Sequence, residues 1–310
     1  MDFLSIVGAL IPVAGLIAFG WVLRRLRLLA DADFWTGAEK LAYFVLLPVL
    51  LFRNISSVDI SHVDIGRLAA ALVLPTVVIT IVLFALHRVL AADAPSFTSV
   101  LQGAIRFNTY IGLSLSATLL GPEGAALAAI VGAVLVPVVN VLSSIAFEVF
   151  LVGKRSWLAL GRSVIVNPLV LGCAGGAAWN LLPVTTPEVV AGIIDPLAAA
   201  ALPIGLLCVG AGIRQVSVRA HAVAFFTSSV VKLLIVPAAT VVSMLAFGIR
   251  GEAAVVGLIF QSIATASSAY VMARQLGGNA ALMAALIAGQ TIISMFTLPI
   301  VLSLGAQLLL

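Results

Sequence analysis

Long apolar runs separated by short polar segments fill this sequence from end to end. A helix that crosses a bilayer needs about 20 consecutive, mostly apolar residues, and ten runs of this kind fit into the 310 residues. They leave no room for a separate soluble domain. The predicted spans are residues 4–23, 37–53, 67–89, 97–120, 124–152, 162–182, 189–213, 220–248, 253–273 and 280–308.

The composition indicates the same class of protein. Hydrophobic residues make up 63% of the chain and charged residues 9%, whereas soluble domains contain about 25% charged residues. The sequence therefore predicts an all-α integral membrane protein whose main partner is the lipid bilayer. The net charge is +4, but the basic residues are scattered among short loops, so no nucleic-acid binding is expected. Cys173 and Cys208 fall inside apolar runs and are most simply interpreted as small core residues.

The basic residues are divided unequally between the two sides of the predicted membrane. Loops on one side would hold eleven of the 16 Lys and Arg residues, loops on the other side three, and two would lie within the membrane. Because basic residues concentrate in cytoplasmic loops, we expect a multi-pass protein of the cytoplasmic (inner) membrane with both termini outside. The eleven are Arg24, Arg25, Arg27, Lys40, Arg88, Lys154, Arg155, Arg162, Arg214, Arg219 and Arg274, and the three are Arg53, Arg67 and Arg250.

The two halves of the chain resemble each other. Four motifs of the first half recur in the same order in the second half, most of them about 156 positions later. Since each half holds five predicted spans, residues 1–153 and 154–310 would form repeats of opposite orientation, as is typical of secondary transporters. The matched pairs are Pro12 and Pro168 (156 apart), Pro48 and Pro203 (155), Gly121 and Gly277 (156), and Pro75 and Pro237 (162).

The fourth span carries polar residues at mid-depth. Arg106 lies about nine residues, or about 14 Å, into this span, close to the middle of a ~30 Å hydrocarbon core. Asn108 would point about 200° away around a continuous helix, so the two side chains share a cavity only if the helix is interrupted. Gly103 and Gly112 weaken a helix here. A break near Asn108 would expose backbone groups that attract an anion.

The equivalent region of the second half is FQSIATASSAY, residues 260–270. The offset of 156 makes Ala264 the counterpart of Asn108. This stretch is rich in hydroxyl residues, including Thr265 and Ser268, but it has no proline or glycine that would interrupt a helix. Two interpretations stay open: the hydroxyl residues line a solute site, or they allow neighbouring helices to pack closely.

Two basic residues, Arg106 and Lys232, fall inside predicted spans, where an ionisable side chain usually has a function. Arg106 could bind a solute or could support the end of a broken helix. For Lys232, mid-depth in the eighth span, support of helix C-terminal carbonyls is favoured over contact with a solute. No acidic residue is predicted at mid-depth. Asp195, nearer the end of its span, is the acidic candidate for support of the crossing or for ion coupling.

Motifs of enzymes are missing from the sequence. It contains no HExxH, GxSxG or CxxC motif. The three histidines fall at loops or span ends, so the sequence shows no pair of a nucleophile and a base at membrane depth. We therefore expect neither an enzyme nor a cofactor or metal site. The histidines are His62, His87 and His221.

Several segments together resemble the auxin efflux carrier family in its short bacterial form. The opening IPVAGLIAFGWVLRRLRLL, then LAYFVLLPVLLFRNIS, then IRFNTYIGLSLSATLLGPEG carry this similarity. VNPLVLG, KLLIVP and the run that ends at Gly289 continue it in the same order. The long cytoplasmic loop of plant members is reduced here to VGKRSW, residues 152–157.

The resemblance implies ten helices in two inverted five-helix repeats, with helices 4 and 9 discontinuous and crossing at the centre. This is a fold like that of bile-acid symporters and sodium/proton antiporters, in which scaffold and transport subdomains move against each other. It also implies that Asn108 contacts a substrate carboxylate. Helix 9 departs from the family, because Ala-Thr-Ala-Ser-Ser replaces a proline-containing crossover. The expected substrate-binding residues are Asn108, Arg106, Thr109, Tyr110, Thr265 and Ser268.

The expected function is secondary transport of a small organic anion, such as auxin-like carboxylates or the dicarboxylates malonate and malate, by elevator-like alternating access. A coupling proton or sodium ion and a homodimeric partner are further candidates. The alternative is a monovalent cation/proton antiporter on the same fold, which would need a central carboxylate. A passive channel or structural membrane protein conflicts with the inverted repeat.

Overall fold

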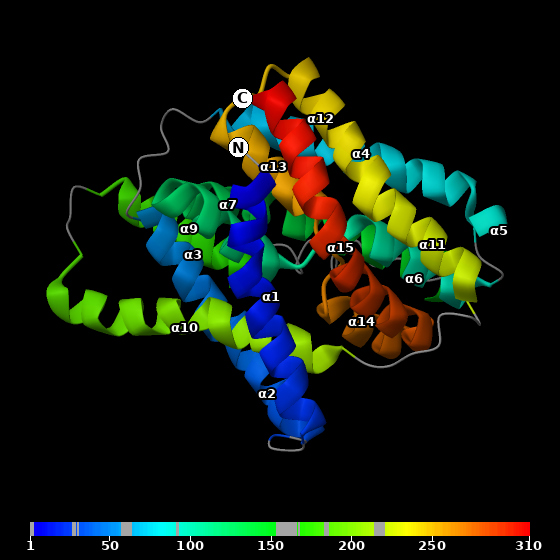
Figure 1. Cartoon of the computed structure of the whole chain (residues 1–310), viewed down its shortest axis with the longest axis horizontal. Helices are drawn as coiled ribbons and strands as arrows, with labels where there is room; N and C mark the ends of the chain where they lie inside the picture. Colours follow the sequence, from blue (N-terminus) through cyan, green and yellow to red (C-terminus); the bar gives the residue numbers. More distant parts are fainter. Residues whose placement is uncertain are drawn as a thin grey trace.

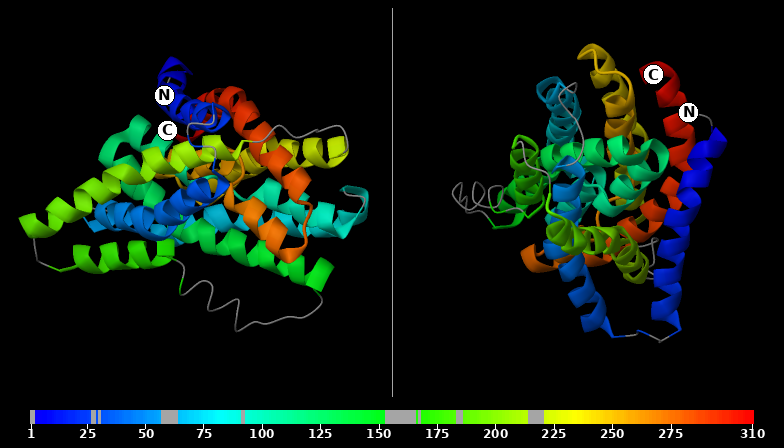
Figure 2. Two further views of the ribbon diagram at one scale, coloured as in Figure 1. Left: turned by 90° about the horizontal axis from the view of Figure 1, so that it is seen from below. Right: turned by 90° about the vertical axis from the view of Figure 1, so that its left-hand side faces the viewer.

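The computed structural model describes residues 3–26, 29, 31–56, 64–90, 93–152, 166, 168–182, 186–213 and 221–310. Every regular element in these ranges is a helix, and seven helical stretches are long and apolar enough to cross a membrane. The expected all-α membrane class is therefore confirmed. The beginning of the first helix and the end of the last helix lie on the same side of the molecule (Figure 1 and Figure 2).

One group of helices, here called the first group, takes members from both halves of the chain. Within it, α1 packs along α10, and α3 packs along α9. α2 continues through a π-helical turn, η1, into α3. The first group comprises α1 (Phe3–Arg25), α2 (Ala32–Leu41), η1 (Ala42–Leu46), α3 (Leu47–Ser56), α9 (Pro168–Asn180) and α10 (Glu188–Gly212).

Glycines let the helices of the first group approach to backbone contact. A Cβ atom at Gly210 of α10 would overlap the carbonyl of Ile17 on α1, and one at Gly172 of α9 would overlap the backbone of Pro48 on α3. Small residues at such positions are the usual means by which membrane helices pack closely. The spacing of these helix pairs is therefore fixed by main-chain atoms.

The remaining helices form the second group, which contains the centre of the molecule. Its members are α4 (Ile65–Ala85), α5 (His87–Leu90), α6 (Ala94–Ile105), α7 (Thr109–Phe147), η2 (Glu148–Val152), α11 (Ala222–Val230), η4 (Val231–Ile235), α12 (Val236–Ala246), α13 (Glu252–Ser262), α14 (Ser268–Leu276) and α15 (Ala280–Leu309). In Figure 1, α6 lies behind α11, and α14 lies beside the lower part of α15.

Gly121 divides the longest helical stretch of the second group. Residues 94–151 form 58 residues of nearly continuous helix, far more than the ~30 Å core of a bilayer requires at about 1.5 Å per residue. Gly121 has non-helical backbone angles, with φ 64° and ψ −149°. The stretch thus changes direction between the two predicted spans 97–120 and 124–152. Gly277, its counterpart in the second half, also has a positive φ, 82°.

Side-chain caps begin several of these helices where the sequence changes from polar to apolar. Asp93 accepts a hydrogen bond from the backbone N–H of Ser96 at the start of α6, at 2.7 Å. Asn279 does the same for Leu282 at the start of α15, at 3.0 Å. Such caps satisfy N–H groups that a helix leaves unpaired at its first turn. Asn279 also donates to Ser96, at 3.0 Å, so the two helix starts are tied together.

Parts of the sequence-based topology lie outside the described residues. These are the segment after Val152, including Gly153 and the beginning of the sixth predicted span. Several basic residues of the expected cytoplasmic loops also lie outside: Arg27, Lys154, Arg155, Arg162, Arg214 and Arg219.

Candidate functional site

The first interruption lies between α6 and α7, at residues 106–108, where the sequence predicts a break. Arg106 and Asn108 have extended backbone angles, with ψ of 161° and 103°. The Asn108 Oδ1 accepts hydrogen bonds from the backbone N–H groups of Tyr110 and Ile111, at 3.1 and 3.3 Å. Asn108 therefore caps α7, and the residue that starts the new helix is part of the break itself.

The second interruption lies between α13 and α14, at residues 263–267, and it is stabilised differently. Its N-cap residue, Ser267, makes no side-chain capping bond to α14. Instead, Gln290 of α15 bridges the two interruptions. Its Oε1 accepts from the Thr265 N–H at 3.1 Å, and its Nε2 donates to the Gly103 carbonyl at 3.1 Å. Helix 9 is thus broken although it has no proline, and contacts from other helices hold the break.

The two interruptions meet directly. The Asn108 N–H donates to the Ala264 carbonyl at 2.9 Å, and the Thr265 hydroxyl donates to the Gln102 carbonyl at 3.2 Å. Asn108 and Ala264 are the pair that the sequence offset of 156 matches. The Asn108 N–H and the Ala264 carbonyl thus find a partner across the crossing, as buried polar groups require, whereas the Gln102 carbonyl also accepts from the Arg106 N–H. The Thr265 hydroxyl serves the contact between the two interruptions.

Arg106 is buried at the crossing, with 8% of its surface exposed. Its Nη2 donates to the Ser268 hydroxyl at 3.1 Å, and its Nη1 lies 3.2 Å from the Met272 Sδ. Both partners belong to α14, so the guanidinium joins the first interruption to the helix that follows the second. Its Nε has no hydrogen-bond partner among the described residues. Arg106 thus supports the crossing and still has a donor to offer.

Other donors at the first interruption are also unpaired. In the described part of the chain, neither the Asn108 Nδ2 nor the Tyr110 hydroxyl has a hydrogen-bond partner, although both residues are buried. The Tyr110 ring packs on Gly205 of α10. Thr109, the first residue of α7, is half-buried. Buried unpaired polar groups are costly, so these atoms mark a place where a polar ligand or water would be stabilised.

Lys232 lies close behind the crossing, on the π-helical turn η4. It is fully buried at 0% exposure, and its Nζ has no hydrogen-bond partner within the described ranges. The Nζ lies 5.8 Å from the centre of the Phe107 ring, which is within range of a cation–π contact. η4 contacts both α6 and α13, the helices that end at the two interruptions.

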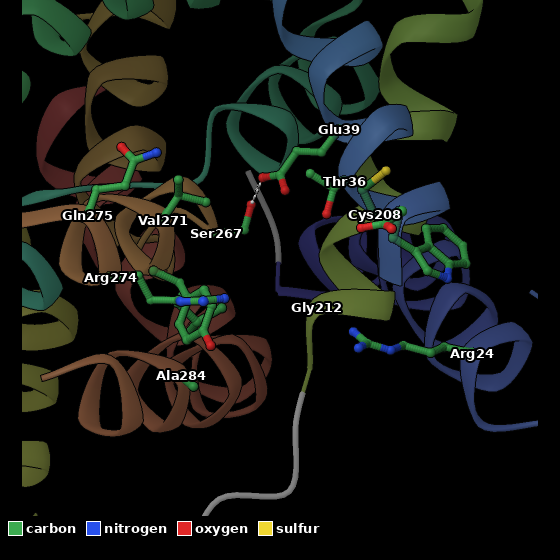
Figure 3. Close-up of a pocket in the computed structure, with 14 residues that line it drawn as sticks. Arg24, Thr36, Glu39, Cys208, Gly212, Ser267, Val271, Arg274, Gln275 and Ala284 are labelled. Carbon is green, nitrogen blue, oxygen red and sulfur yellow. Dashed lines mark hydrogen bonds between the residues drawn. The ribbon is translucent and has the colours of Figure 1, made fainter. Parts of the chain in front are cut away.

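A cavity of about 480 Å³ opens beside the crossing, between α1, α2 and α10 on one side and α14 and α15 on the other. In Figure 3, the Arg24 and Arg274 side chains extend toward one another from opposite sides of it. Arg24 donates to the Ala211 carbonyl. The cavity is lined by Arg24, Asp33, Trp35, Thr36, Glu39, Cys208, Gly212, Ser267, Tyr270, Val271, Arg274, Gln275, Ala284 and Ile287.

Glu39 is the acidic residue of this site that the sequence interpretation missed. Its Oε1 accepts a hydrogen bond from the Ser267 hydroxyl at 2.9 Å, the contact drawn as a dashed line in Figure 3. Glu39 stands near the beginning of the second predicted span, 228 residues before Ser267. The one signal in the sequence is an acidic residue directly at the border of an apolar run.

Asp195 is placed elsewhere than expected. Its carboxylate forms an ion pair with Arg53, and about half of each side chain is exposed. The structure therefore brings Arg106, Asn108, Thr109, Tyr110, Thr265 and Ser268 together at the crossing, with Lys232 behind them, but not Asp195. Among the described residues, no group of three or more His, Cys, Asp or Glu side chains could hold a metal ion.

Comparison with known proteins identifies the family of the chain. A family model described as membrane transport protein matches residues 5–302, nearly the whole chain. No curated protein matches the sequence significantly. The chain therefore belongs to the membrane transport protein family of the auxin efflux carriers, and it is a multi-pass membrane transporter rather than an enzyme.

Proposed function

We propose that this transporter carries small organic anions, auxin-like carboxylates or dicarboxylates such as malonate and malate, by alternating access. The observation that carries the proposal is the crossing itself. A buried guanidinium, Arg106, and an unpaired amide donor, Asn108 Nδ2, lie where two helices are interrupted. A carboxylate that leaves water needs such donors to replace its hydration, and a helix N-terminus favours negative charge.

The arrangement of the helices supports an elevator-like movement. The first group is held by backbone contacts between its helices, whereas both interruptions belong to the second group. The cavity lies where the two groups meet. We take the first group as the scaffold and the second group as the transport unit. Together the two groups would comprise ten spans in two inverted repeats. The positive φ at Gly121 and Gly277, and the contact of Asn108 with Ala264, support this repeat.

The orientation follows from the basic residues. Arg24 and Arg274, which line the cavity, belong to the side that the positive-inside rule assigns to the cytoplasm. With the termini outside, the cavity described here opens inward, in the cytoplasmic membrane. A cysteine introduced at Gly153 should then be protected from an impermeant reagent on intact cells.

A monovalent cation/proton antiporter is the second candidate, and Glu39 is the observation in its favour. This carboxylate reaches the second interruption, where an antiporter would need an acid. Arg106 nevertheless places a positive charge at the same crossing, and this charge favours an anion. We therefore retain the organic anion as the substrate.

The test is transport in proteoliposomes that contain the purified protein. We expect uptake of labelled malonate that unlabelled malonate inhibits, and loss of this uptake in Asn108→Ala. Asn180→Ala is the matched control, because Asn180 hydrogen-bonds to the Ile55 carbonyl in the first group, on α9. Sodium or potassium flux driven by a pH gradient, without malonate uptake, would instead identify an antiporter.

A further inference from the structure

Glu39 occupies the place in the cavity that suits the carboxylate of a ligand. Its side chain is half-buried and lines the cavity. The Ser267 hydroxyl that donates to it belongs to the N-cap residue of α14. This end of α14 carries the positive side of the helix dipole. The protein's own carboxylate thus takes up the Ser267 donor beside the crossing.

The charged residues that line the cavity around Glu39 come from α1, α2 and α14. Guanidinium groups approach from α1 and α14, and a second carboxylate comes from α2. Tyr110 of α7 is close enough to interact electrostatically with Glu39, and Tyr43 of η1 with Arg106. The titratable and charged groups facing the region are Arg24, Asp33, Tyr43, Arg106, Tyr110, Cys208, Tyr270 and Arg274.

We propose that Glu39 is the proton-binding residue that couples this transporter to the proton gradient. The inference rests on the proposed function, because it requires an anion at the crossing, next to Glu39 and Ser267. An ionised Glu39 repels an incoming carboxylate and occupies the Ser267 donor. Protonation from the solution at the mouth of the cavity removes the negative charge and releases that donor. Anion and proton therefore bind with positive coupling, and each favours the other to the same extent.

Two substitutions separate the charge of Glu39 from its hydrogen bond. Glu39→Gln removes the negative charge and keeps the size and polarity of the side chain, so it should imitate the uncharged, protonated state. Ser267→Ala removes the hydrogen bond but leaves the carboxyl able to titrate. Asp33→Asn is the matched control, because Asp33 also lies on α2, lines the same cavity and is exposed.

The experiment is titration calorimetry of the purified full-length protein with malonate, in neutral to mildly alkaline buffers where malonate stays a dianion. In wild type, Asp33→Asn and Ser267→Ala, the dissociation constant should rise by up to about tenfold per pH unit, as uptake of one proton per anion requires. In Glu39→Gln it should stay within about twofold across the range, and at the alkaline end it should be at least about tenfold lower than in wild type.

Proton uptake by the wild-type protein gives a second readout that does not depend on any variant folding. Titrations in buffers of different ionisation enthalpy should show about one proton bound per malonate. Wild-type binding without proton uptake, or Glu39→Gln with unchanged pH dependence, would overturn the assignment of Glu39 while leaving anion transport intact. Absence of binding of every dicarboxylate tested, in folded wild-type protein, would instead overturn the proposed function, and the coupling with it.

Discussion

The two interruptions at the centre of this transporter look alike but are stabilised by different means. The first contains its own cap, because Asn108 both ends the extended segment and accepts from the first N–H groups of α7. The second has no such cap, and its conformation depends on Gln290 of α15 and on Glu39 of α2. A local signal therefore specifies one break, and tertiary contacts specify the other. The second should respond more strongly to substitutions far away in sequence.

The largest effect is expected from Gln290→Leu. It would leave the buried Thr265 N–H and Gly103 carbonyl without partners, at a cost of about 1–3 kcal/mol each. Denaturation of the purified protein should show a clear loss of stability, and malonate binding should be lost with it. Gln275→Leu, at an exposed glutamine of α14, is the control and should change stability little. Equal stability of the two variants would show that Gln290 does not hold the second interruption.

Asn108 offers a way to separate capping from substrate contact. Asn108→Ala should lose both, with about 0.5–2 kcal/mol of stability and about 10- to 150-fold in malonate affinity, since a hydrogen bond to a charged group contributes about 1.5–3 kcal/mol. Asn108→Ser keeps a capping oxygen but removes the amide donor. It should retain stability and lose affinity, as thermal unfolding and calorimetry would measure. Wild-type affinity in Asn108→Ser would remove the amide from the binding site.

Lys232 tests whether the crossing needs a positive charge behind it. Lys232→Met should fold at least as stably as wild type, because a buried cation without an acidic partner is costly. Malonate transport should nevertheless fall by about tenfold, since charge at helix C-termini contributes up to about 2 kcal/mol. Lys232→Arg should retain more transport than Lys232→Met. Wild-type transport rates in Lys232→Met proteoliposomes would show that the charge is dispensable.

The smallest effect is expected from Thr265→Val. The hydroxyl donates to the Gln102 carbonyl, so its removal should cost about 0.5–1.5 kcal/mol of stability. Malonate affinity should change by less than about twofold, because this hydroxyl is already used in the crossing. A tenfold loss of affinity with unchanged stability would place Thr265 among the residues that contact the substrate.

The difference between a locally capped interruption and one held by tertiary contacts explains how far the sequence could predict the site. Arg106 and Asn108 predict the first interruption, because one continuous helix could not direct both side chains into one cavity. Nothing within residues 263–267 predicts the second, since its determinants lie on α2 and α15. Glu39 was missed for the same reason: its partner is 228 residues away. Asp195 was a candidate as an acidic residue within a predicted span, and its ion pair with Arg53 is created by the packing of α3 against α10.

The helix contacts made through glycine carry a mechanical consequence. Where α1 meets α10 and α3 meets α9, a glycine lies against main-chain atoms of the neighbouring helix. A slip by one residue would replace that glycine with a residue whose Cβ atom overlaps the neighbouring backbone. Where α7 meets α10, by contrast, the flat ring of Tyr110 rests on Gly205. A flat aromatic ring against a glycine backbone has no interlocking side chains, so it opposes sliding less. The first group would thus behave as a stiff frame, and sliding would be concentrated where its contacts are smoothest.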